Sequence, residues 1–76
     1  MPITTREVRQ FLMAQDPDFR RLAEEHSRCE FQLETLLNQV YRNSEDLIQE
    51  AVLKKLKLHL KDQMALLIAD YQHKFA

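Results

Sequence analysis

The sequence predicts an all-α fold, an antiparallel helical hairpin with coiled-coil-like packing and a short N-terminal helix. Three observations predict it. None of the 76 residues is glycine. A polar break at residues 43–46 separates two long rows of regularly spaced apolar residues. The first row has strict 3,4 spacing, which places its members on one stripe of a helix: Phe19, Leu22, His26, Cys29, Leu33, Leu36 and Val40.

The composition limits the chain to one small helical domain over residues 1–76. A chain of this size buries about 60–65% of its unfolded surface, so a lone hairpin is marginal and association is the expected remedy. The single cysteine cannot form an internal disulfide, and the net charge is −1. Residues 1–8 lack the apolar core of a signal peptide, and no run reaches the roughly 20 apolar residues of a membrane span. We therefore expect a soluble cytoplasmic protein with no membrane association.

A short first helix is predicted over about residues 5–14. Thr4 and Glu7 have the spacing of a capping box, and Val8, Phe11 and Leu12 follow at helical spacing. So short a helix persists only when it packs on another surface.

The second helix is predicted over about residues 17–42. Asp16 is a typical N-cap, proline at position 17 suits the first helical turn, and Asp18 complements the helix dipole. Pro17 also disfavours helical dihedral angles at Asp16, which indicates that the first helix ends there.

The third helix is predicted over about residues 45–74, with Ser44 as its N-cap and His73 and Lys74 near its C-terminus. Its apolar row has 3,4,4 spacing, close to that of a straight helix. The row consists of Leu53, Leu56, Leu60, Met64, Leu67, Tyr71 and Phe75.

The other side of the third helix is also apolar, and one hairpin partner cannot cover both sides. Phe31 likewise points away from the seam of the second helix. This excess predicts an interaction surface for a second copy or a helical protein partner. Besides Phe31, the residues are Leu47, Ile48, Ala51, Leu58, Ala65, Leu66 and Ala69.

A lysine cluster on the third helix supports an alternative, binding of nucleic acid or the ribosome. It consists of Lys54, Lys55, Lys57 and Lys61. Folding the hairpin brings Glu34 level with Lys54 and Glu30 level with Lys57, so we interpret the cluster mainly as partners of these acids. Nucleic-acid sites usually combine net positive charge with interleaved aromatic residues, which this chain lacks.

His26 and Cys29 form a polar pair in the seam, and His59 comes to a similar height. Together they offer three ligands, whereas structural zinc takes four, so we predict no metal site. We expect Cys29 to be core and His26 to bond a neighbour such as Asp62, Lys61 or Glu30. No catalytic or cofactor-binding motif is present, so we expect neither an enzyme nor a small-molecule substrate.

Three blocks of sequence carry a family resemblance over about residues 7–68. They are the run 16–19 (Asp-Pro-Asp-Phe), Leu22 with Glu25 and His26, and the run 53–62, which ends in Leu-Lys-Asp. The chain resembles the YdcH-like family of small bacterial proteins, defined mainly as a domain of unknown function. It departs from the pattern at Cys29, where leucine is usual, and at Leu56, where an acid is common. The resemblance implies a helical hairpin of the bacterial cytosol and no activity, ligand or catalytic residue.

Overall fold

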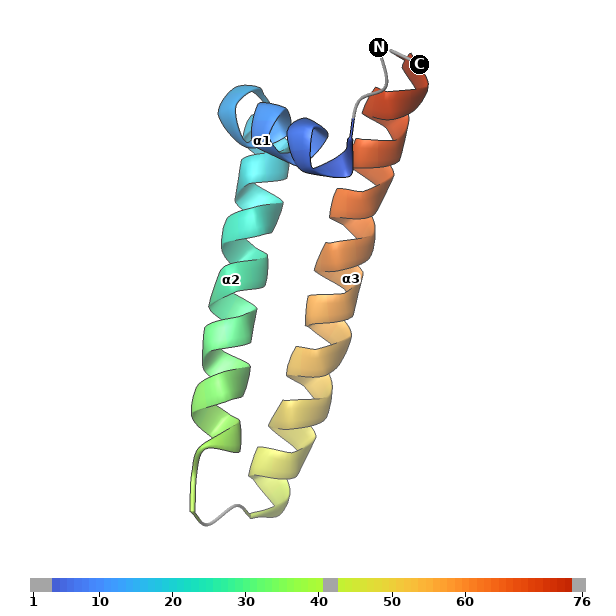
Figure 1. Cartoon of the computed structure of the whole chain (residues 1–76). Helices are drawn as coiled ribbons and strands as arrows, with labels where there is room; N and C mark the ends of the chain where they lie inside the picture. The colour runs from blue at the N-terminus through green and yellow to red at the C-terminus, as the bar shows by residue number, and fades with distance from the viewer. Residues whose placement is uncertain (1–3, 41–42, 75–76) are drawn as a thin grey trace.

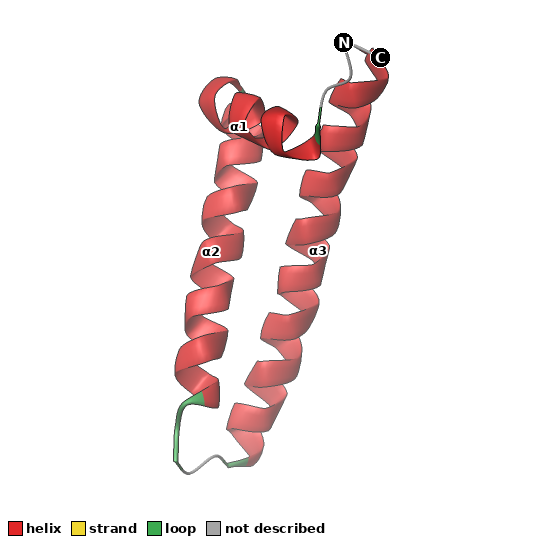
Figure 2. Cartoon of the chain, in the orientation of Figure 1, coloured by secondary structure: helices red, strands yellow, loops and turns green. Residues whose placement is uncertain are grey.

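The computed structural model describes residues 4–40 and 43–74. They form three helices, α1 (Thr5–Gln15), α2 (Pro17–Leu37) and α3 (Ser44–Lys74) (Figure 1). Within these described residues the chain contains no strand (Figure 2). The predicted all-α class is confirmed.

The molecule is elongated, with extents of 51 × 19 × 17 Å. The chain reverses direction between α2 and α3, which lie side by side (Figure 1). The short α1 crosses the end of this pair where α2 begins and α3 ends. One end of the molecule therefore contains three helices and the other contains two.

The corner between α1 and α2 is built from local hydrogen bonds. The Thr4 hydroxyl accepts from the Glu7 N–H at 3.1 Å. The Asp16 carboxylate accepts from the N–H groups of residues 18 and 19 at 2.9 and 3.3 Å, which satisfies two donors at the start of α2. Both predicted caps are confirmed. Arg20 then donates from Nε and Nη2 to the carbonyls of residues 13 and 14 at the end of α1.

Helix α2 ends at Leu37, five residues earlier than predicted. Asn38 has φ −86° and ψ −1°, and its N–H bonds the carbonyl of residue 34 at 3.1 Å. The next N–H bonds the carbonyl of Leu36, which tightens the last turn. Val40 is consequently 88% exposed, so its predicted place in the seam is wrong. Residues 41–42, the end of the predicted helix, lie outside the described residues.

The start of α3 is a reciprocal capping box centred on Asn43. The Asn43 side chain accepts from the Asp46 N–H at 2.9 Å, and the Asp46 carboxylate accepts from the Asn43 N–H at 3.1 Å. Ser44 is the first helical residue rather than the N-cap. The predicted cap is therefore wrong by one position, because an asparagine side chain reaches the same amide donors.

The core consists of two clusters, which we call the α1-end cluster and the turn-end cluster. The half-buried Leu22 packs against both. The α1-end cluster draws on all three helices and consists of Val8, Leu12, Phe19, Met64 and Ile68. The turn-end cluster draws on α2 and α3 alone and consists of Cys29, Leu33, Leu36, Leu53 and Leu60.

The buried stripe of α3 differs from the predicted row at two places. Leu56 is 45% exposed, whereas Ile68, absent from the predicted row, is buried. Ile68 belongs to the cluster that α1 completes. Because α1 packs on the side of α3 that carries Ile68, this residue is buried at the α1 end. Phe75 lies outside the described residues.

Candidate functional site

The side of α3 that faces away from α2 is apolar and exposed. Leu47, Leu58 and Leu66 are 53, 59 and 64% exposed, although leucine is among the residue types most often buried. We call this surface the outer face. The structure exposes all seven of its predicted α3 residues: Leu47, Ile48, Ala51, Leu58, Ala65, Leu66 and Ala69. Val52, which was not among the predicted residues although it stands between them in the sequence, is also exposed.

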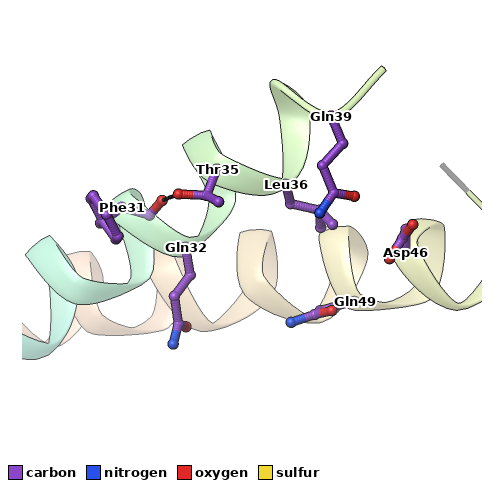
Figure 3. Close-up of a pocket in the computed structure, with 7 residues that line it drawn as sticks. All are labelled: Phe31, Gln32, Thr35, Leu36, Gln39, Asp46 and Gln49. Atoms are coloured by element: carbon purple, nitrogen blue, oxygen red, sulfur yellow. Dashed lines mark hydrogen bonds between the residues drawn. The ribbon is translucent and has the colours of Figure 1, made fainter. Parts of the chain in front are cut away.

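Phe31 is 70% exposed, but it lies on α2 rather than on the outer face. It lines an open pocket of about 250 Å³ at the turn end, between α2 and α3. Figure 3 shows the side chains that line this pocket. The Thr35 hydroxyl there donates to the Phe31 carbonyl at 2.9 Å. Three amide side chains line the pocket, those of Gln32, Gln39 and Gln49, with Leu36 and Asp46 completing it.

This pocket was not predicted, because glutamine side chains at helical spacing give no distinctive sequence signal. Its one carboxylate, that of Asp46, already accepts a backbone hydrogen bond at the start of α3. The remaining polar lining can form hydrogen bonds but offers no strong base or nucleophile. The pocket therefore carries no catalytic assignment.

The lysine cluster is partly neutralised by neighbouring acids. Lys57 forms an ion pair with Glu30 across the two helices at 3.1 Å, as the folded-back arrangement predicts. Lys54 pairs with Glu50 on its own helix at 3.4 Å, so the predicted pair with Glu34 is wrong. Lys61 lines a groove beside Arg9. The cluster is therefore not a continuous stripe of unpaired cations.

The ion pair between Glu30 and Lys57 lowers the pKa of Glu30. The Lys57 ammonium group donates a hydrogen bond to the Glu30 carboxylate and attracts its charge, which holds the pKa of Glu30 below its ordinary value of 4.5. His26 contributes a smaller effect of the same sign. Both partners are substantially exposed, so this contact favours one register of the two helices more than it stabilises the fold.

Cys29 is a buried member of the turn-end cluster, 2% exposed. Its thiol donates a hydrogen bond to the Leu53 carbonyl at 3.1 Å and so joins α2 to α3. The predicted place of Cys29 in the core is confirmed. His26 is half-buried, and in the described part of the chain it makes none of the expected hydrogen bonds to Asp62, Lys61 or Glu30.

His26, Cys29 and His59 do not converge on one point. Across residues 4–40 and 43–74, no three histidine, cysteine or acidic side chains are grouped so as to hold a metal ion. Among the same residues, no helix combines the length and the apolar character needed to cross a membrane.

Comparison with known families supplies an identification. The sequence model of one family, described as "Protein of unknown function (DUF465)", matches residues 19–68, which is more than half of the chain. The chain belongs to the DUF465 family. The match begins at Phe19 and ends at Ile68, so it covers most of α2 and most of α3 and excludes α1. No curated protein and no solved structure matched the chain.

Proposed function

We propose that this DUF465 protein is a non-enzymatic helical interaction module that associates with itself. In this proposal α2 and α3 act as an antiparallel, coiled-coil-like hairpin, and the outer face of α3 binds a second chain. The observation that carries the proposal is the exposure of large apolar side chains on that face, with Leu58 59% and Leu66 64% exposed. Contiguous exposed apolar surface usually marks an interaction site.

The size of the domain supports the same proposal. A 76-residue chain without an internal disulfide has little apolar surface to bury within itself. Association is one of the few means by which so small a scaffold gains stability. As part of the same proposal, we infer that the chain is a YdcH-like protein of the bacterial cytoplasm.

Binding of nucleic acid or the ribosome through the lysine cluster is the second candidate. Lys55 and Lys61, both exposed, favour it. Two other lysines are engaged by Glu30 and Glu50, which lowers the net positive charge of the cluster. Binding to RNA or DNA that weakens with salt and disappears when all four lysines become glutamine would support it.

Light scattering on three forms of the purified chain tests the main proposal. We expect the wild type to associate at high micromolar concentration and Leu58→Glu to remain a folded monomer. Gln63→Glu adds the same charge at an exposed position of α3 outside the outer face, so it should associate like the wild type. A monomeric wild type at the same concentration would contradict self-association.

A further inference from the structure

Five of the seven predicted residues of the outer face of α3, all except Ile48 and Leu66, have a spacing that reads the same in both directions from Leu58. Ala51 and Ala65 each lie seven residues from Leu58, and Leu47 and Ala69 each lie eleven residues from it. At about 100° per residue, these five positions fall within about 40° of one another around the helix. They extend over about 33 Å of α3 at 1.5 Å per residue.

We propose that the partner on this face is a second copy of the same chain, paired antiparallel about a two-fold axis at Leu58. The inference rests on the proposed function and specifies its geometry. A two-fold interface must be complementary to itself, and this spacing meets that condition. Leu47 then faces Ala69 of the second copy, Ala51 faces Ala65, and Leu58 faces its own equivalent. Leu47 of each copy thus meets a small residue and Ala51 meets another alanine, which lets the two helices approach closely on either side of Leu58.

Charged residues on the flanks of the stripe suit a second copy of the chain and distinguish the two orientations. Lys55 and Asp62 lie on the same flank of the stripe, on opposite sides of Leu58 along the helix. Within the described residues, neither side chain takes part in an ion pair. In the antiparallel dimer, Lys55 of each copy lies opposite Asp62 of the other, so two ion pairs form by symmetry. A parallel pair instead brings Lys55 opposite Lys54 of the second copy and Asp62 opposite Lys61, so Lys55→Asp should strengthen a parallel pair and weaken the antiparallel one.

The opposite flank is compatible with this arrangement. There Lys54 faces Lys61 of the second copy, which places two cations near each other. Lys54, however, is already paired with Glu50 of its own chain at 3.4 Å. The Glu50 carboxylate therefore offsets part of the repulsion.

Charge reversal tests the orientation in the full-length chain. We expect Lys55→Asp and Asp62→Lys each to raise the dimer dissociation constant about tenfold, since each creates two like-charge contacts. The double variant should restore the wild-type value, because it exchanges the two charges. Sedimentation equilibrium measures all three. A double variant that associates no better than the single variants would overturn the antiparallel arrangement.

Disulfide trapping gives an independent readout. In a Cys29→Ala background, chains carrying Ala51→Cys are mixed with chains carrying Ala65→Cys and oxidised with glutathione. We expect disulfides between the two kinds of chain, because positions 51 and 65 face each other. Disulfides mainly between two Ala51→Cys chains would indicate parallel pairing and overturn the inference. If Cys29→Ala prevents folding, the charge-reversal series, which retains Cys29, decides the question.

The two proposals fail in different ways. A wild-type chain that stays monomeric removes both the self-association and its geometry. A wild-type dimer that shows neither charge rescue nor mixed disulfides removes only the antiparallel pairing about Leu58. Loss of dimerisation in Leu58→Glu with retained helicity would still place the contact on the outer face.

Discussion

The two ends of the molecule are built differently. At the α1 end three helices meet, and Val8 and Phe19 are completely buried. At the turn end only α2 and α3 meet, and Leu33 keeps 8% of its surface exposed. Large apolar side chains point outward nearby, among them Leu47 and Ile48. A pair of helices can bury one stripe from each member, so the third helix decides how much of each end is covered.

The first prediction compares the two clusters directly. Phe19→Ala should lower the free energy of unfolding by about 4 kcal/mol, because it leaves a cavity where three helices meet. Leu36→Ala in the turn-end cluster should cost about 2 kcal/mol, because two helices close more easily around the lost volume. Urea unfolding measures both. If Phe19→Ala fails to fold, Phe19→Leu keeps the comparison measurable. An equal or larger loss in Leu36→Ala would reverse the ranking of the two ends.

The second prediction is that the turn-end cluster, although two helices alone cover it, excludes solvent from Cys29. Cys29 is 2% exposed and bonded to the Leu53 carbonyl, so its thiol should react with a thiol reagent about a hundredfold more slowly than in urea. Ser27→Cys in a Cys29→Ala background is the control, since residue 27 is exposed on the same helix. Native labelling of Cys29 as fast as that of the control would show that the turn end opens freely.

The third prediction concerns the caps at the two ends. Asp16→Ala removes the acceptor for two N–H groups at the start of α2 and should cost about 1 kcal/mol of unfolding free energy. Asn43→Ala removes one acceptor at the start of α3 and should cost somewhat less. Asp16→Asn keeps an oxygen acceptor and serves as the control. Chemical denaturation followed by circular dichroism separates these variants, and a silent Asp16→Ala would contradict the capping role.

The fourth and smallest effect concerns pH. Lys57 lowers the pKa of Glu30 in the folded chain below its ordinary value of 4.5, so the unfolded chain binds more protons between the two values. The resulting stabilisation is complete above pH 4.5 and is lost as the pH falls through the folded pKa. We expect Glu30→Gln to be slightly less stable than the wild type at neutral pH and to match it in acid. Thermal melts across this range measure the difference, and a pH-independent gap would exclude the ion pair as its cause.

Local signals made the α1 end predictable. Asp16 followed by Pro17 marks the boundary between α1 and α2, because the cap and the fixed proline φ act within a few residues. The spacing of apolar residues likewise placed Phe19, Cys29 and Leu33 in the core. Matching the residues that lie at the same height in an antiparallel hairpin also predicted the contact between Glu30 and Lys57.

The misses have two physical causes, the point at which a helix ends and tertiary packing that overrides helical periodicity. Val40 continues the spacing of the seam, but α2 ends at Leu37 with no glycine to announce it. Ile68 is buried because α1 packs on its side of α3, whereas Leu56 has no such cover. The polar pocket beside Phe31 depends on the juxtaposition of two helices, which no local pattern encodes.

The concentration dependence of the melting temperature tests most directly whether a second chain completes the cover of α3. A partner that binds only the folded state raises the melting temperature as concentration rises. We predict this rise for the wild type and for Gln63→Glu, and a constant melting temperature for a folded Leu58→Glu chain. A wild-type melting temperature that stays the same from low to high micromolar concentration would contradict association through the outer face.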